Sequence, residues 1–322
     1  MQQYVIRRLL LFLPSLIGAS MIVFGVMHIL PGDVALAILG EQAQEGGGAY
    51  TLRQADILRE HLGLNDPIHV QYGKWLWSML SGGFGGESLL ENEPIGDIVA
   101  RRLPVTLQLT ILTMAITVLV SLPLGVIAAL YQDKPPDYVI RTISILGLAM
   151  PNFWVALLFL LGLVVFFAWS PPIIYENFWQ SPTTNAQIMI WPALTLAWGS
   201  SSFLVRVTRA QVLEVLRQDY VRTAYSKGLA PATVIARHVM RNALLPVITL
   251  LGTNLDAQLS GSVILENVFG IPGLGQGIIF HAKLQDWPVI VSLAMLLVFI
   301  TLIINLIIDL TYVFIDPRIS YK

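Results

Sequence analysis

The side chains that could do chemistry in this chain are few, and their spacing argues against catalysis. The five histidines are scattered and none pairs at i, i+4 as metal ligands on a helix do: His28, His61, His69, His238 and His281. No Gly-x-x-x-x-Gly-Lys-Ser/Thr motif is present, which excludes ATP hydrolysis by a P-loop. Cysteine is absent, which excludes a catalytic thiol, a thiolate metal site and disulfides. These residues predict a protein that is not an enzyme.

A glycine-rich segment near position 275 gives a weak nucleotide-binding signal. Gly273-x-Gly275-x-Gly277 has the spacing of phosphate-binding glycines, but apolar spans flank it and no strand precedes it. The glycines are therefore not interpreted as a nucleotide site. The nearby His281 is expected in a loop at the outer surface.

A carboxylate inside an apolar segment is the most unusual polar group. Asn254, Asp256 and Gln258 alternate, so on a helix Asn254 and Gln258 share a face and Asp256 points elsewhere. A charge near the bilayer centre costs about 2.5–3.5 kcal/mol on insertion scales, so it needs water or a polar partner. Two interpretations stay open. Either these residues line a substrate path where Asp256 meets a positive group, or Asp256 pairs with a neighbouring helix or partner subunit.

A basic stretch separates two apolar segments. Residues 219–246 contain Arg222, Lys227, Arg237 and Arg241, and the positive-inside rule places such a stretch in the cytoplasm. Val221, Ala224 and Tyr225 recur at helical spacing, Gly228 interrupts the run, and Pro231 suits the start of another helix. The pattern predicts two short surface helices joined by an elbow.

The elements that position these residues are predicted to be membrane helices. Of the 322 residues 55% are hydrophobic and 12% charged, whereas soluble domains carry about a quarter charged residues. The chain is therefore expected to be an all-α polytopic membrane protein. Six spans are predicted, the third bent near Pro151: 9–30, 105–130, 138–169, 188–207, 243–268 and 287–315. With both termini inside, thirteen of the nineteen Lys and Arg residues face the cytoplasm.

Two further segments admit alternatives. Residues 31–103 are polar and acidic, with a flexible link at 42–48 and short helices expected at 52–62 and 70–80; they form either an extracytoplasmic cap or a linker. Five hydroxyls in the second span repeat at steps of three or four and either pack between helices or line a path: Thr106, Thr110, Thr113, Thr117 and Ser121.

Several segments together carry a family resemblance. Arg222-Thr-Ala-x-x-Lys-Gly-Leu229 and His238-Val-x-Arg-Asn-Ala-Leu-Leu-Pro246 resemble the cytoplasmic loop of binding-protein-dependent ABC importer permeases, in the dipeptide/oligopeptide/nickel branch. Leu30-Pro-Gly-Asp33 and Arg102-Leu-Pro-Val-Thr-Leu107 are also similar to that branch. Residues 269–277 resemble the family's extracytoplasmic Pro-Gly-Leu-Gly turn, which implies a turn outside the membrane. Two positions depart from the pattern: Arg222-Thr223 replaces Glu-Ala, and Gly82-Gly-Phe-Gly85 replaces Gly-Asp-Leu-Gly.

The resemblance implies a type I ABC importer permease fold and a non-catalytic translocation subunit. It implies a first helix within 1–30, a cap at 31–103, a permease core at 104–315 with a coupling loop at 208–243, and a cytoplasmic tail at 316–322. The residues that it assigns to ATPase coupling are Arg222, Thr223, Ala224, Lys227, Gly228 and Leu229.

The resemblance also implies the partners, the substrate class and the location. The partners are a second homologous permease, two ATPase subunits that hold ATP and Mg, an extracytoplasmic binding protein and membrane lipid, with no cofactor in this chain and no nucleic acid. The substrates are expected to be di- or oligopeptides, with nickel chelates, glutathione or another small solute as alternatives. The location is a prokaryotic cytoplasmic membrane. An ion-coupled secondary transporter, which would show inverted repeats and paired intramembrane charges, fits less well.

Overall fold

The chain forms helices in most of the described residues. The structure is a computed structural model that describes residues 2–29, 53, 56, 57, 59, 60 and 65–315. The expected link at 42–48, most of the expected helix at 52–62, the motif at 30–33 and the tail at 316–322 lie outside these residues. Among these residues, the β-structure consists of one isolated antiparallel bridge between Glu87 and Pro94. The all-α prediction is confirmed.

Within the described residues, five helices are long and apolar enough to cross a membrane. Each contains or matches a predicted span, although α6 begins about ten residues before the expected start of the second span. The five helices are α1 (Gln2–Ile29), α6 (Ile95–Leu130), α9 (Pro182–Leu216), α12 (Met240–Phe269) and α14 (Trp287–Ile315). The expected helix at 70–80 is present as α5 (Ile68–Leu80).

The third predicted span, 138–169, is a bent pair of helices. The helices α7 (Pro135–Ala149) and α8 (Asn152–Phe167) meet at 109°. The bend was expected at Pro151, and its cause is local: Met150 adopts an extended conformation, as residues before proline do, and Pro151 then caps α8. With 15 and 16 residues, these helices measure only about 22 and 24 Å, less than the roughly 30 Å hydrocarbon core.

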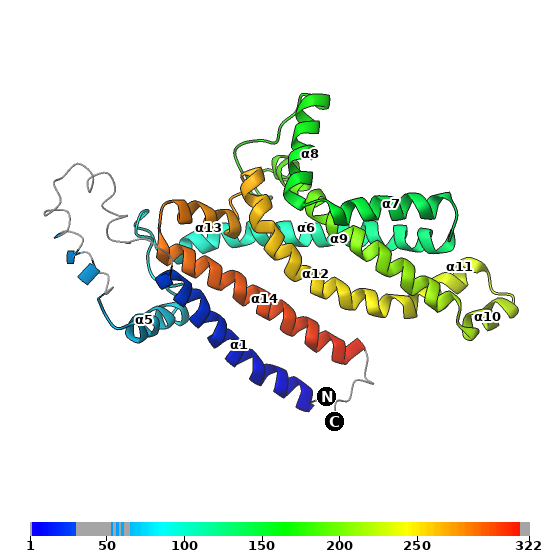
Figure 1. Cartoon of the computed structure of the whole chain (residues 1–322), viewed down its shortest axis with the longest axis horizontal. Coiled ribbons are helices and arrows are strands. Elements are labelled where there is room, and N and C mark those ends of the chain that lie inside the picture. The colour runs from blue at the N-terminus through cyan, green and yellow to red at the C-terminus, as the bar shows by residue number, and fades with distance from the viewer. Residues whose placement is uncertain (1, 30–52, 54–55, 58, 61–64, 316–322) are drawn as a thin grey trace. The chain divides into compact units, whose positions relative to one another are not determined.

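Residue contacts divide the chain into two compact units. Unit 1 comprises residues 1–5, 106–271 and 303–322, and unit 2 comprises residues 6–105 and 272–302. In unit 1, α9 packs against α7, α8 and α12 (Figure 1). Leu204, Val247 and Leu251 form a buried cluster there. Glycine permits two close approaches, because a β-carbon on Gly147 would lie 2.0 Å from Ser202 Oγ and one on Gly252 would lie 2.8 Å from Ile308.

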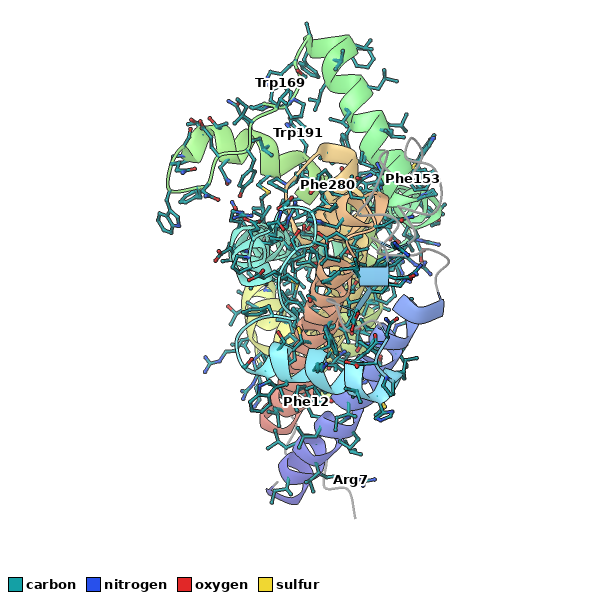
Figure 2. All side chains as sticks on the ribbon, turned by 90° about the vertical axis from the view of Figure 1, so that its left-hand side faces the viewer. Arg7, Phe12, Phe153, Trp169, Trp191 and Phe280 are labelled. Atoms are coloured by element: carbon teal, nitrogen blue, oxygen red, sulfur yellow. The ribbon has the colours of Figure 1, made fainter. Side chains whose placement is uncertain are left out.

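Aromatic side chains gather at one end of unit 1. Trp169, just after α8, and Trp191 on α9 have ring centroids 5.8 Å apart, and Figure 2 shows them beside each other. The loop between α8 and α9 also exposes Ile173 and Trp179 almost completely. Its placement at the outer interface stays a prediction.

Unit 2 has its own apolar core. Ile95, Ile98, Leu274, Val289 and Leu293 are fully buried together. The helix α1 contacts α5 through a hydrogen bond of 2.7 Å between Ser20 Oγ and Tyr72 Oη, in which either hydroxyl can be the donor.

The expectation of a surface loop around His281 is wrong. The helix α13 (Leu274–Lys283) begins directly after Gly273, and His281 in its last turn is 0% exposed. Leu274 and His281 are seven residues apart and therefore lie on one helix face, which turns toward the core. The expected turn consequently ends at Gly273. Position 277 on this helix has no room for a side chain, because a β-carbon there would lie 2.9 Å from Arg102 Cδ.

Candidate coupling helix and intramembrane polar groups

The basic stretch forms a short amphipathic helix with one buried face. The helix α10 (Asp219–Ser226) buries Val221 and Ala224, which are three residues apart, and exposes the side chains between them. Thr223 Oγ1 donates to the Asp219 carbonyl at 3.0 Å, and Ser226 Oγ donates to the Arg222 carbonyl at 3.1 Å. These hydroxyls satisfy helix carbonyls and leave the outer face of α10 open.

The exposed face contains most of the residues assigned to coupling. Arg222 is 75% exposed and lies 3.6 Å from Asp219, which is 97% exposed, so this ion pair restrains it little. Thr223, Lys227 and Leu229 are also exposed. Gly228 adopts a φ of +76°, and a β-carbon added there would meet no atom within 4 Å, so backbone conformation alone favours glycine at this position.

Ala224 belongs to the opposite face. It lies with Val221 in a buried cluster formed by the ends of several helices: Ala129 on α6, Val212 and Val215 on α9, Val234 and Val239, and Ala243 on α12. Ala224 therefore attaches α10 to its own chain, while the other five assigned residues remain accessible. Tyr225, which recurs with Val221 and Ala224 at helical spacing, is 42% exposed and is not part of that cluster.

The second half of the stretch contains a wide helical turn. After α11 (Pro231–Thr233), the π-helix η1 (Val234–Val239) leads directly into α12. Tyr220 on α10 accepts a hydrogen bond of 2.8 Å from Asn242 Nδ2 on α12, which ties both ends of the elbow together. The spacing of apolar residues indicated helices here, but no sequence signal distinguished a π-turn from an α-turn.

A buried ion pair that sequence reasoning missed joins α7 to α9. Arg209 Nε and Nη2 each donate to one oxygen of Asp137 at 2.7 Å, in a two-point arrangement. Asp137 is 0% exposed and also accepts from the Asp133 backbone N–H at 3.0 Å. The pair lies two turns before the end of α9, where the chain leads into α10.

The polar residues of the fifth span differ in their surroundings. Asn254 Nδ2 donates to the Leu250 carbonyl at 3.1 Å, so its amide is satisfied within the helix. Gln258 is 2% exposed, and neither of its amide atoms has a hydrogen-bond partner among the described residues. Asp256 is half-buried, and its Oδ1 atom likewise lacks a partner there. Asp256 and Gln258 are therefore polar groups in an apolar span whose hydrogen bonds the described part of this chain does not supply.

The five hydroxyls of the second span are buried. Thr106 donates to Glu266 Oε1 at 2.7 Å, and Thr110 donates to the Thr106 carbonyl at 2.8 Å. Thr113, Thr117 and Ser121 are 0% exposed. Their burial favours helix packing over the lining of a path. Glu266, a buried carboxylate on α12, was missed because its separation of 160 residues from Thr106 gives no local signal.

A polar cluster in unit 2 fixes the start of α14. Asp286 accepts hydrogen bonds from Ser88 Oγ at 2.5 Å and from the Leu89 N–H at 3.3 Å, and His281 Nδ1 lies 3.5 Å from its carboxylate. Burial acts to raise the pKa of Asp286, but His281, Ser88 and the Leu89 N–H together outweigh it and lower the pKa below its usual value. The carboxylate is therefore held in its ionised form.

Comparisons with known proteins agree with this architecture. Residues 121–321 match the family described as binding-protein-dependent transport system inner membrane component. Residues 1–110 match the N-terminal part described as binding-protein-dependent transport system membrane component. The two matches together cover most of the chain.

Individual relatives match the chain from end to end. The oligopeptide transport system permease protein AppB of Bacillus subtilis is 36% identical over 323 residues, which is 100% of both chains. The glutathione transport system permease protein GsiC of Salmonella typhi is 34% identical over 322 residues, again 100% of both. Among solved structures, the MetNI methionine ABC transporter in an inward-facing conformation superimposes with a TM-score of 0.55 at 17% identity, covering 70% of this chain and 99% of that chain. At this identity the likeness concerns the fold.

Proposed function

Because this chain belongs to the family of binding-protein-dependent transport system inner membrane components, we propose that it forms one half of the path of a peptide importer. The family membership makes it a multi-pass inner-membrane permease of an ABC transporter, without catalytic residues or a cofactor of its own. ATP is bound by a partner ATPase. The transporter belongs to the peptide and glutathione branch, and peptides are the substrates that we propose for it.

The observation that carries the coupling proposal is the two-faced helix α10. One face is fixed to the chain's own core by Val221 and Ala224, and the other presents Arg222, Thr223 and Lys227 to solvent. A helix with two such faces can dock its exposed face into a groove of a second protein while its buried face stays packed on its own chain. We assign the docking role to Arg222, Thr223, Lys227, Gly228 and Leu229, and the attachment role to Ala224.

ATP binding to the ATPase subunits supplies the energy, and a rearrangement of these subunits transmits it. Two such subunits on the cytoplasmic side, one for this chain and one for a second homologous permease, draw together when ATP binds and displace α10. Moving a two-state helix bundle from 1:99 to 99:1 takes about 5.5 kcal/mol of differential binding. An extracytoplasmic binding protein delivers the substrate, and residues 31–103 are the part of this chain that we propose for its reception.

Asp256 is the group that we propose for the substrate path. Its half-buried carboxylate lies in a membrane span and has an oxygen without a partner among the described residues. A positive group that passes along the span would supply the missing interaction. The ammonium of a peptide amino terminus is such a group, and Asn254 and Gln258 lie within one turn of Asp256 on α12.

The coupling proposal is tested on the complex reconstituted with its own ATPase subunits and binding protein. Arg222→Ala and Lys227→Ala together should lower substrate-stimulated ATP hydrolysis and co-purification of the ATPase by about tenfold. Arg217→Gln is the matched control, because Arg217 is an exposed basic residue that ends α9 and lies outside the α10 face. Full coupling in the double variant would overturn the docking role.

The substrate is tested with the same complex. Uptake of free-amino and N-acetylated di- and oligopeptides, glutathione and a nickel chelate is compared at equal concentration. We expect uptake of peptides with a free amino terminus. Uptake of glutathione or the chelate alone would overturn the proposed substrate and leave the coupling proposal intact.

A further inference from the structure

A lateral groove in unit 1 belongs neither to the coupling helix nor to the surroundings of Asp256. It lies between α6, α7 and α9 and has a volume of about 350 Å³. This volume falls within the range of about 300–1,000 Å³ typical of ligand sites. Its walls are mainly aliphatic and include Ile116 and Val120 of α6, Ile140 and Ile143 of α7, and Leu194 and Val205 of α9.

The rim of the groove favours an apolar occupant. Val120, Val139 and Ile143 are 36%, 56% and 43% exposed, and the described residues that line the groove include no charged side chain. All three belong to segments that are candidates to cross the membrane. A solute that stays in water would have to cross this apolar rim, whereas a hydrocarbon chain enters it directly from the bilayer.

Two polar atoms inside the groove lack partners. The Ser201 hydroxyl and the Trp198 Nε1–H are buried, and neither makes a hydrogen bond with any part of the chain that the structure describes. Ser201 is only 5% exposed. Because a buried polar group without a partner costs about 1–3 kcal/mol, a hydrogen-bond acceptor on the occupant would be stabilising here. The occupant therefore combines a long apolar part with an acceptor oxygen.

One exposed basic residue follows the groove on α9. Arg206 lies four positions after the lining residue Ser202, and therefore on the same helix face one turn further on; it is exposed and forms no ion pair with a described residue. Arg141 on α7 is already paired, since its Nη1 atom lies 3.9 Å from the Asp137 carboxylate. Arg206 lies five positions after Ser201, which is about 7.5 Å along the helix. An occupant that satisfies both positions carries its negative charge a short distance beyond its acceptor oxygen.

We propose that this groove is a binding site for an anionic phospholipid of the inner leaflet. The phosphate lies at Arg206, an ester carbonyl accepts from Ser201 and Trp198, and one acyl chain lies along the groove toward Leu194. Basic sites between membrane helices on the cytoplasmic side hold anionic headgroups in this way. The choice of leaflet rests on the orientation in the proposed function, because it requires Arg206 on the cytoplasmic side. The bound lipid bridges α7 and α9, the helix that continues into α10.

The experiment uses the assembled complex in phosphatidylcholine nanodiscs. Brominated phosphatidylglycerol or brominated phosphatidylcholine is added at the same mole fraction, because bromine quenches tryptophan fluorescence on contact. The chain has eight tryptophans, so the Trp198 signal is the difference between the parent complex and a Trp198→Phe complex. We expect the anionic lipid to quench this signal with an apparent affinity on the order of fivefold higher, the preference that one basic residue confers.

Two variants locate the preference. Arg206→Gln should remove it, whereas Arg217→Gln, at an exposed position just after the same helix, should retain it. Ser201→Leu, which fills the groove, should abolish the quenching of Trp198 by both lipids. If Ser201→Leu fails to fold, the two arginine variants still decide the question.

Three results would overturn the proposal. Equal quenching by the two lipids would mean ordinary annular lipid only. An unquenched Trp198 in the parent complex would mean that protein covers the groove. An equal loss in Arg206→Gln and Arg217→Gln would mean a general surface-charge effect. Since no arm measures transport, a failure of the proposed function would leave these readouts unchanged.

Discussion

Loss of the buried Asp137–Arg209 pair should be costly. Asp137 is fully buried and each of its oxygens accepts from Arg209 at 2.7 Å. Asp137→Asn leaves the guanidinium without its charge partner, and breaking a buried pair in this way costs about 3–5 kcal/mol. We expect a fall of about 3 kcal/mol in the free energy of unfolding, measured by denaturant titration in detergent.

The neighbouring carboxylate provides the control for this substitution. Asp133 is exposed and its side chain contacts Gln132 at 3.2 Å. Asp133→Asn should change the stability by less than about 0.5 kcal/mol, as exposed substitutions do. Equal effects of the two substitutions would show that the buried pair contributes nothing specific.

Asp286 should make stability depend on pH. Its folded pKa lies below the usual value, so its contribution is fully present above the unfolded pKa of about 3.9 and is lost as pH falls through the folded pKa. The thermal midpoint of the parent protein should therefore fall more steeply below about pH 4 than that of Asp286→Asn. Parallel profiles of the two proteins from neutral to acidic pH would contradict this assignment.

Asp256 should discriminate between substrates by their charge. If its carboxylate meets an amino terminus, Asp256→Asn should weaken the apparent affinity for free peptides by about tenfold, the value of one hydrogen bond to a charged group. Uptake of N-acetylated peptides should not change. Asn254→Ala is the control, because the Asn254 amide is satisfied by the Leu250 carbonyl. A uniform loss that accompanies failed assembly with the second permease would favour pairing between subunits instead.

At the scale of elements, the elbow after α10 depends on one backbone conformation. Gly228 has φ +76°, and its Cβ direction is open, so Gly228→Ala adds about 1–2 kcal/mol of conformational strain without a clash. We expect weaker ATPase association, measured by co-purification. Gly228→Asn should retain more of it, since asparagine tolerates this conformation better. Equal association of the alanine variant and the parent would show that the turn is not needed in this form.

Periodicity predicted the elements well because apolar spans are long and proline and glycine mark their ends. The bend at Pro151 and the two-sided helix around Val221 and Ala224 follow from such local rules. The Asp137–Arg209 pair joins residues 72 positions apart, and nothing local to either residue reveals the other. The burial of His281 was missed for the same reason, since the core that covers it is assembled from distant segments. The residues proposed for coupling were predicted from the resemblance and partly from the pattern, and that prediction stays untested. The burial of Ala224 became visible only in the packing.

At the scale of the whole molecule, the orientation of the chain can be tested directly. The chain contains no cysteine, so single cysteines report unambiguously. We expect Thr223→Cys to react with a membrane-impermeant maleimide only from the cytoplasmic side of the membrane. Ile173→Cys, at a residue 98% exposed in the loop between α8 and α9, should react only from the other side. Labelling of both from one side would overturn the six-span topology.

The shared packing around α10 has a mechanical consequence. Val221 and Ala224 belong to one buried cluster with the ends of α6, α9, η1 and α12, so a force on α10 is borne by four elements at once. We therefore expect α10 and this cluster to move as one rigid body. Bending is then expected further along the helices. Pro192 in α9 and Pro246 in α12 each remove a backbone hydrogen bond from the helix interior. We expect that a displacement of α10 from the cytoplasmic side would bend α9 at Pro192 and α12 at Pro246.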